Sequence, residues 1–294
     1  MVDAGNILNE KTNTTNREQA LRKTIAISEA YKLMGYDAIG VGPYDLLSEE
    51  SIIEQLKATK LPLISCNFYH QSGDLVFEPY KSYQMAGLDV AIIGITGTTS
   101  LQTSDFYITE GITELSQNVK SLRPTHDIII LLSTLRQARV VEVITNQIEG
   151  IDIVIGGDSR HGSINSLQFS DSLITQTAEL GKSLGILEIT WRGKPWKVDY
   201  QKQISRLKRS LNRVNRLLMK NKSSKSSAQK SDEKQKQLLD RKNQLITLIE
   251  ETEKKKDNTQ QRTDRSTFRS RSMVLDSRMV EDQEMRKLLQ TAGF

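Results

Sequence analysis

The sequence is poor in the residues that mark disulfide-stapled, haem-carrying or membrane-spanning proteins. Its 294 residues include one cysteine, Cys66, so no internal disulfide can form and cysteine usage indicates no redox compartment. No apolar run approaches the ~20 residues that a helix needs to cross a bilayer, and no C-x-x-C-H motif is present to attach haem. The first residues, M-V-D-A-G-N, lack a basic segment followed by an apolar one, which predicts no secretory signal within this chain.

Histidine is also scarce. The chain has three histidines, His70, His126 and His161, and no two stand at the short spacing typical of zinc sites. A surface or capping role is therefore the ordinary expectation for each of them.

Charge is unevenly distributed along the chain. Residues 1–195 contain 16 Lys and Arg against 23 Asp and Glu, a net charge of −7, whereas residues 196–294 contain 25 against 13, a net charge of +12. The front part also holds nearly all the β-branched runs and most glycines. We therefore expect a folded domain over 1–195, a basic helical hairpin over 196–256, and a polar linker, short strand and C-terminal helix over 257–294.

Short apolar runs alternate with amphipathic segments in the front part. Helices are predicted over 16–34, 48–59, 111–122 and 136–147, and strands over 2–5, 37–42, 61–67, 76–84, 88–96, 127–132, from 151, over 172–178 and over 184–191. The two strands around Ala86-Gly87 are predicted to form a hairpin. This alternation indicates an α/β fold with a layered sandwich of sheets and helices.

The most informative stretch is 151–161, which reads I-D-I-V-I-G-G-D-S-R-H. Branched aliphatic residues followed by two glycines predict a buried strand that ends in a tight turn. Ligands bind at the carboxyl ends of strands in open α/β sheets, so Asp158, Arg160 and His161 stand where a functional site is expected. The stretch resembles the closing motif of the calcineurin-like metallophosphoesterases, in the 5'-nucleotidase/UDP-sugar hydrolase branch, which reads Gly-Gly-His-Ser-His or Gly-Gly-His-Ser-Gln after an apolar strand.

Five further blocks are similar to motifs of the same family and follow in the family's order. They are D-A-I-G-V-G-P-Y-D-L (37–46), L-P-L-I-S-C-N (61–67), L-D-V-A-I-I-G-I-T (88–96), D-I-I-I-L-L-S-T-L (127–135) and the segment 175–187. The resemblance implies a metallophosphoesterase-like β-sandwich flanked by helices over residues 1 to ~190. It also implies an earlier first strand, which is missing here, and a nucleoside-gripping domain, which has no counterpart in this chain.

The family binds two divalent metal ions through Asp, Asn and His side chains, which generate hydroxide and hold the phosphate. The resemblance places other residues at these positions in this sequence. Asn6 replaces the bridging Asp, Pro43 the Asn, Tyr44 the His beside it, Thr134 the next His, and Asp158 and Arg160 the last two. Only Asp158 and Asp45 would then offset the charge of two dications, which is too little for a di-metal centre. We expect no metal cofactor and no phosphohydrolase activity by the family's mechanism.

Two interpretations of this edge stay open. Arg160, His161 and the Gly156-Gly157 turn present donors suited to an anion. Alternatively, Asp158 pairs with Arg160 or Arg136 and fills the former metal pocket as a structural ion pair. The candidate ligand-binding residues are Asn6, Asp45, Asn67, Thr134, Asp158, Arg160 and His161, and the candidate catalytic residues are Cys66, Tyr44, Asp158 and His161.

Cys66 follows a predicted buried strand, beside Asn67 and on the same edge as the other motifs. A thiol of low pKa there would serve as a redox group or nucleophile. The alternative is the common role of a single buried cysteine, which is that of a small hydrophobic residue.

The basic part has a heptad pattern. Apolar residues recur at spacings of four and three, at Tyr200, Ile204, Leu207, Leu211, Val214 and Leu218. A polar turn over 221–231 and a second helix over 232–256 complete an antiparallel hairpin of the coiled-coil type. The apolar seam predicts self-association or a protein partner, and the +12 charge indicates either an anionic surface as partner or a solvated helix face. Nucleic acid is not expected, because no aromatic interleaving or known binding motif is present.

Two functions are consistent with these features. The first is a degenerate member of the fold that serves as a binding or scaffold module in the cell envelope. The second is an active hydrolase, or a thiol-dependent enzyme, with a rebuilt site. The family resemblance favours a periplasmic or envelope location, and a cytoplasmic one is the alternative.

Overall fold

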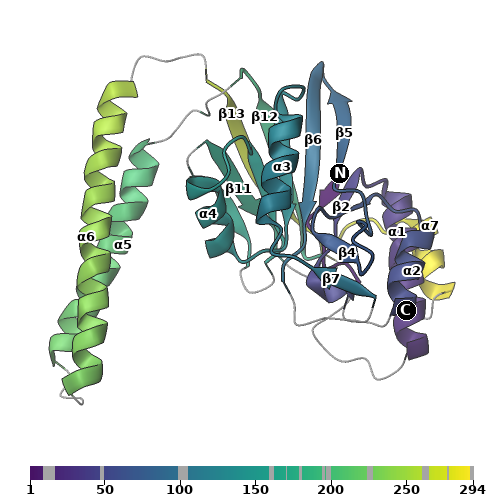
Figure 1. Ribbon diagram of the computed structural model, residues 1–294, viewed down its shortest axis with the longest axis horizontal. Helices are drawn as coiled ribbons and strands as arrows, with labels where there is room; N and C mark the ends of the chain where they lie inside the picture. Colours follow the sequence, from purple (N-terminus) through teal and green to yellow (C-terminus); the bar gives the residue numbers. More distant parts are fainter. Residues whose placement is uncertain are drawn as a thin grey trace. The chain divides into compact units, whose positions relative to one another are not determined.

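The computed structural model describes residues 1–8, 17–46, 50–98, 105–158, 162–169, 171–178, 181–193, 196, 200–223, 228–259, 265–276 and 278–291 (Figure 1). Contacts divide the chain into two compact units. The first unit comprises residues 1–189 and 268–294, and the second comprises residues 190–267.

Two sheets form the centre of the first unit. The smaller is parallel and consists of β1 (Val2–Asp3), β2 (Ala38–Gly40) and β3 (Leu63–Ile64). The larger has the order β10 (Ile164–Phe169), β11 (Ser172–Gln176), β9 (Ile153–Gly156), β8 (Ile128–Ser133), β6 (Leu88–Ile95) and β5 (Tyr80–Met85). Its four central strands are parallel and both edge strands are antiparallel to their neighbours.

The two sheets approach each other closely, and glycine makes this possible. A Cβ atom on Gly94 of β6 would lie 2.3 Å from the carbonyl oxygen of Ile64 in β3, which no side chain could occupy. The amide of Cys66 donates a 2.8 Å hydrogen bond to the carbonyl of Gly94, so the backbones of the two sheets are linked directly. The absence of a side chain at residue 94 therefore sets the spacing of the sandwich here.

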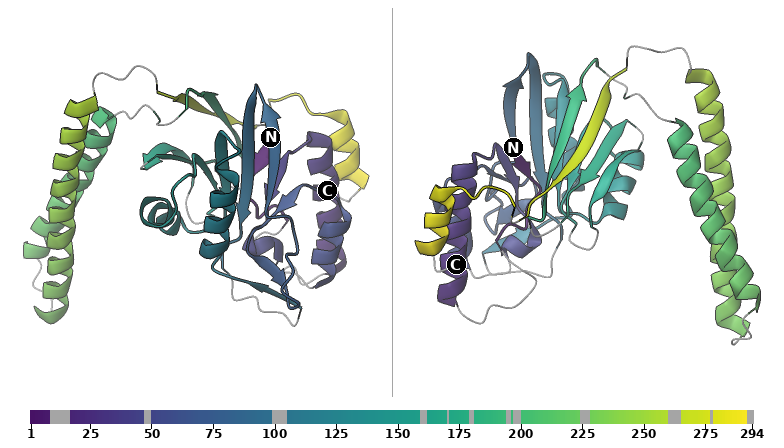
Figure 2. Two further views of the ribbon diagram at one scale, coloured as in Figure 1. Left: turned by 45° about the horizontal axis from the view of Figure 1, so that its top comes forward. Right: turned by 180° about the vertical axis from the view of Figure 1, so that it is seen from behind.

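Helices cover the outer face of each sheet. They are α1 (Arg17–Met34), α2 (Glu50–Ala58), α3 (Ile112–Leu122) and α4 (Gln137–Asn146). Leu115 of α3 and Val143 of α4 belong to a core that includes Ile93 and Leu131 of the larger sheet. A second core packs α2 and part of α1 against the smaller sheet. The layers follow the order helix, sheet, sheet, helix, as Figure 2 shows. This arrangement confirms the predicted layered α/β sandwich.

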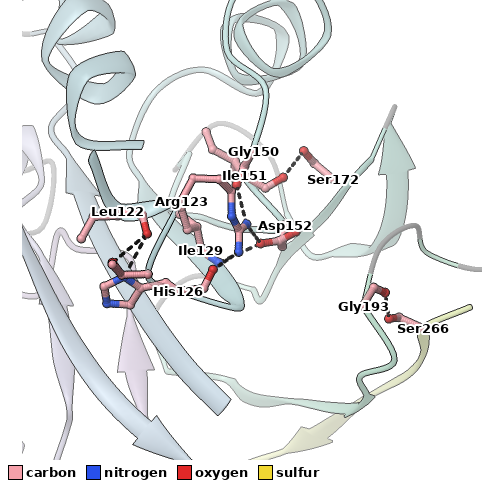
Figure 3. A network of polar contacts seen from close by, with 11 residues as sticks. Leu122, Arg123, His126, Ile129, Gly150, Ile151, Asp152, Ser172, Gly193 and Ser266 are labelled. Atoms are coloured by element: carbon pink, nitrogen blue, oxygen red, sulfur yellow. Dashed lines mark hydrogen bonds and ion pairs between the residues drawn. The ribbon is translucent and has the colours of Figure 1, made fainter. Parts of the chain in front are cut away.

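A polar cluster fixes the ends of three elements at the opposite edge from the predicted site (Figure 3). The fully buried carboxylate of Asp152 accepts hydrogen bonds from Arg123 Nη1 at 2.6 Å and from the amide of Ile129 at 2.8 Å. Arg123 also donates to the carbonyls of Gly150, at 3.1 Å, and His126. The cluster thereby ties the end of α3 to the beginnings of β8 and β9. His126 lies in this turn, where its ring contacts the carbonyl of Leu122 at 3.0 Å.

The end of the chain forms a strand and a helix that pack with elements of the first unit. Strand β13 (Thr267–Val274) pairs with β12 (Ser183–Thr190), and α7 (Gln283–Thr291) packs against α1. The last residues therefore belong to the first unit, and the helical hairpin is an insertion between β12 and β13. Strand β13 lies within the range for which a short strand was predicted. A further short pair, β4 (Phe68–His70) with β7 (Phe106–Ile108), was not predicted.

The second unit is a helical hairpin. Helices α5 (Tyr200–Ser223) and α6 (Ala228–Thr259) lie side by side and run in opposite directions, and Lys208 forms a 2.9 Å ion pair with Glu253 between them (Figure 1). Ile204 and Val214, two residues of the predicted apolar seam of α5, are buried, as are Leu245 and Ile249 of α6. Helix α5 ends at Ser223 and α6 begins at Ala228, so both helices extend into the range predicted as a polar turn. No helix among the described residues is both long and apolar enough to span a bilayer.

Candidate functional site

Loops from both sheets converge at the carboxyl ends of the parallel strands. Asn6, which follows β1, donates from Nδ2 to the carbonyl of Gly157 after β9, at 3.3 Å. Its Oδ1 accepts a 3.0 Å hydrogen bond from the amide of Tyr44, which follows β2. A Cβ atom on Gly157 would lie 3.3 Å from Cγ2 of Thr134, so β8 ends beside the same point. The structure thus brings together four of the predicted motifs.

Asp45 acts as an anchor for backbone amides. Its Oδ2 accepts hydrogen bonds from the amides of Asn6 and Gly42, both at 2.8 Å, and its Oδ1 accepts one from the amide of Leu8 at 2.9 Å. The residue is 2% exposed, and burial raises the pKa of the carboxyl to about 6 while the three amide donors act to lower it. Both oxygens of this carboxylate therefore hold the loop after β1 against the turn after β2.

The side-chain amide and the backbone conformation of Asn6 both suit this position. Its φ of 66° lies in the left-handed region, which asparagine tolerates better than most residues. A Cβ atom on Gly42 would lie 2.1 Å from Asn6 Oδ1, so glycine is required beside it. The amide group supplies a donor to one loop and an acceptor to another, which a carboxylate cannot do.

Asn67 is fully buried and its side chain is saturated with hydrogen bonds. Its Nδ2 donates to the carbonyls of Thr96 at 2.9 Å and Thr109 at 2.8 Å, and its Oδ1 accepts from the amide of Thr96 at 2.8 Å. Thr96 Oγ1 in turn donates to the carbonyl of Val41 at 2.8 Å. This network connects β3, β6 and the end of β2, so Asn67 has a structural role.

Thr134 and Asp158 also bond to nearby backbone. Thr134 Oγ1 accepts a 2.8 Å hydrogen bond from the amide of Gly97, which follows β6. Asp158 is buried, and its Oδ2 accepts a 3.1 Å hydrogen bond from the amide of Gln137, the first residue of α4. The N-cap residue, Arg136, makes no side-chain capping bond. Asp158, which follows β9, therefore accepts a hydrogen bond from a backbone amide at the N-terminal, positive end of the α4 dipole.

Cys66 is not the low-pKa thiol considered above. It is 1% exposed and lies in the core beneath α3. Burial, and secondarily the charge of Glu114, raises the pKa of the thiol to about 12. The thiol is consequently protonated and shielded at neutral pH, as expected for a small hydrophobic residue.

The remaining candidates contribute less. Tyr44 participates through its backbone amide, which donates to Oδ1 of Asn6. Arg160 and His161 lie outside the described residues. Within the described residues, no three His, Cys, Asp or Glu side chains are grouped so that they could hold a metal ion.

Gln176 is a site residue that sequence reasoning missed. Its Oε1 accepts from the amide of Asp158 at 3.1 Å, and its Nε2 donates to the carbonyls of Asp158 at 3.0 Å and Gly162 at 3.1 Å. It therefore clamps the turn after β9 from the neighbouring strand β11. No local pattern distinguishes this glutamine from an ordinary strand residue.

This layering, with motif loops at the carboxyl edge, is similar to the fold of solved 5'-nucleotidases. The chain is similar in structure to the 5'-nucleotidase precursor from Thermus thermophilus, with a TM-score of 0.55 and 20% identity over 65% of this chain and 41% of that chain. The NAD nucleotidase from Haemophilus influenzae gives a TM-score of 0.54 with 17% identity, over 64% of this chain and 42% of that chain.

The sequence comparison is more specific. The chain is 32% identical to Protein UshA from Yersinia enterocolitica over 108 residues, which are 33% of this chain and 20% of that protein. It is 25% identical to Protein UshA from Escherichia coli over 114 residues, which are 38% of this chain and 20% of that protein. These alignments span about a fifth of the curated relatives' length, and no family model matches. The predicted resemblance to the UshA-like 5'-nucleotidase branch is confirmed.

Proposed function

We propose that the chain is a binding or scaffold module built on a degenerate 5'-nucleotidase sandwich, without two-metal phosphohydrolase activity. The observation that supports this most directly is the use of side chains at the carboxyl edge. Asn6 and Asp45 stand at or next to family ligand positions, and each is engaged with backbone groups of neighbouring loops.

The donor set does not fit a pair of divalent cations. The two oxygens of Asp45 already accept three amide hydrogen bonds, and Nδ2 of Asn6, which donates to Gly157, offers a proton rather than a lone pair. Asp158 bonds to the start of α4. Hard and borderline divalent metals need several anionic or imidazole ligands facing one point, and these side chains face the backbone instead.

The test is a metal and turnover measurement on the purified chain. After exposure to excess Mn²⁺ or Zn²⁺ and dialysis, we expect less than one equivalent of tightly held metal. Phosphate release from a 5'-mononucleotide and from bis(p-nitrophenyl) phosphate should not exceed the buffer rate. The 5'-nucleotidase from Vibrio cholerae, 32% identical over 65 residues, serves as the positive control in the same assay. Two equivalents of metal together with turnover would overturn the proposal.

The alternative is an active hydrolase or thiol-dependent enzyme with a rebuilt site. The burial and raised pKa of Cys66 weigh against the thiol version. Metal-independent turnover that survives in Cys66→Ser would support a rebuilt hydrolase, and turnover lost in that variant would support the thiol enzyme.

We also infer, from the relatives alone, that the module works in the periplasm or cell envelope. Self-association through the hairpin is the natural oligomeric arrangement for the partly apolar α6, on which Leu239 and Leu248 are exposed. Size-exclusion chromatography with light scattering measures this directly, and a strict monomer at high concentration would contradict it.

A further inference from the structure

Helix α5 carries charge of one sign only. Between Tyr200 and Ser223 the sequence holds eight Lys and Arg residues and no Asp or Glu. Six of the eight recur at spacings of four and three along the helix. They are Lys202, Arg206, Arg209, Arg213, Arg216 and Lys220, which we call the cationic stripe.

The stripe occupies one face of α5. Residues at spacings of three and four lie on the same side of a helix. Each stripe position follows an apolar seam position by two residues, about 200° around the helix axis, so the stripe runs opposite the seam. With a rise of about 1.5 Å per residue, the six positions extend over about 27 Å with one cation every ~5 Å.

The described side chains of the stripe are available. Arg209, Arg213 and Arg216 are exposed, and none of the three forms an ion pair with a carboxylate among the described residues. Arg209 and Arg216 donate from Nε only to carbonyls of their own helix, at 3.3 and 3.4 Å. Lys208, which stands outside the stripe, is the α5 cation paired with Glu253 of α6. The hairpin therefore neutralises a cation beside the seam and leaves the opposite face charged.

We propose that the cationic stripe is a docking surface for a membrane surface rich in anionic phospholipids. A row of cations along a rod meets a flat anionic plane along its whole length, and clusters of four to eight Lys and Arg on one helix are typical of such contacts. Because the apolar face of α5 is packed on α6, the contact is electrostatic and peripheral, without insertion into the bilayer.

A nucleic acid fits this helix less well. A helix in the major groove needs base-contacting polar residues at the centre of its face and cations on both flanks that reach the two backbones. Here the cations are central, and small polar residues such as Ser205, Ser210 and Asn212 stand beside them. Helix α5 also lacks aromatic residues after Tyr200 for stacking on bases.

The experiment is vesicle co-sedimentation of the full chain at 0.1 M salt. One vesicle preparation is phosphatidylcholine alone and the other contains 30% phosphatidylglycerol. We expect binding to the second only, with loss at 0.5 M salt. Each cation near an anionic leaflet contributes about a fivefold gain in partitioning, so Arg209→Gln/Arg213→Gln/Arg216→Gln should weaken binding about 100-fold.

The matched control is Arg241→Gln/Lys254→Gln/Lys287→Gln, which removes the same charge from exposed positions on α6 and α7. It should bind within about threefold of wild type, and circular dichroism verifies the helix content of both variants. Absence of binding to phosphatidylglycerol vesicles overturns the proposal. An equal loss in both variants overturns it too, because net charge alone would then explain binding. Tighter, stripe-dependent binding to duplex nucleic acid or to poly-glutamate, without vesicle binding, assigns the stripe to another partner.

Discussion

Replacing Asn6 by aspartate introduces the residue type that the family resemblance predicts at this position, and it tests whether the edge suits a metal ion. In this chain the substitution should destabilise the fold. The 3.3 Å hydrogen bond from Asn6 Nδ2 to the carbonyl of Gly157 is lost, which costs about 1 kcal/mol. A carboxylate then faces that carbonyl and stands beside buried Asp45, whose Oδ2 accepts from the Asn6 amide.

The electrostatic part is the larger one. Two buried like charges a few ångströms apart repel by roughly 2–4 kcal/mol at the effective dielectric constant of a protein. Part of this is relieved by the stronger bond from the amide of Tyr44 to a charged acceptor. We therefore expect Asn6→Asp to lower the free energy of unfolding by about 3 kcal/mol at pH 7.5, and by less at pH 5, where the new carboxyl is protonated.

Urea denaturation followed by circular dichroism measures the change, with and without 1 mM Mn²⁺. The control is Asn6→Gly, which tolerates the left-handed φ of 66° and removes both side-chain hydrogen bonds without adding charge. It should cost about 1–2 kcal/mol. If Asn6→Asp is no less stable than Asn6→Gly, the electrostatic reasoning is wrong. If Mn²⁺ stabilises Asn6→Asp by several kcal/mol and wild type equally, the loops accept a metal ion and the proposed function fails.

Three further predictions concern buried groups. Burial raises the pKa of Asp45 to about 6 from 3.8, so the folded state holds the extra proton between pH 4 and pH 6 and stability falls as pH rises through this window. The change is up to about 3 kcal/mol. Urea melts should therefore show the free energy of unfolding of wild type falling by up to that amount relative to Asp45→Asn from pH 4 to pH 6. A constant difference between the two proteins contradicts the assignment. Asp152→Ala leaves Arg123 partly buried without its 2.6 Å carboxylate partner and should cost about 3–5 kcal/mol; Asp127→Ala, at an exposed carboxylate nearby that accepts one amide bond, is the control and should cost about 1 kcal/mol. Cys66, 1% exposed with its pKa raised to about 12, should resist a thiol reagent such as DTNB in the native state and react fully in denaturant; rapid native labelling refutes its burial.

Local pattern was sufficient for most elements of the first unit. The predicted hairpin around Ala86-Gly87 is β5 and β6, and both turn residues have a positive φ, of 51° and 78°. The predicted helices at 111–122 and 136–147 match α3 and α4 to within one residue at each end. These segments have strong hydrophobic periodicity, which is a property of the local sequence.

Pairing across the hairpin could not be predicted in the same way. Strands β12 and β13 are neighbours in the sheet, although the whole of α5 and α6 lies between them in sequence. Nothing local to Thr267–Val274 indicates which strand it joins. Composition along the chain therefore does not reveal that the terminal segment belongs to the first unit.

The site was predictable in position but not in chemistry. The resemblance located Asn6, Asp45 and Thr134 at one edge, and the structure brings them there. Their partners are backbone amides and carbonyls, and the availability of these groups depends on loop conformation, which the residue types alone do not specify. Gln176 was missed for the same reason, since its role arises from the position of β11 beside the turn after β9.

The polar side chains at the carboxyl edge and the arginines of α5 differ in how far their hydrogen-bonding capacity is already used within the fold. At the carboxyl edge, buried polar side chains such as Asp45 and Asn67 bond to the backbone, so their hydrogen-bonding capacity is used within the fold. If such a side chain bound a ligand, it would lose a stabilising hydrogen bond to the backbone. On α5, by contrast, the exposed arginines bond only to their own helix or to solvent, and they can take an anionic partner without that loss. Any favourable binding energy is therefore more readily gained at the cationic stripe than at the edge that corresponds to the family's active site.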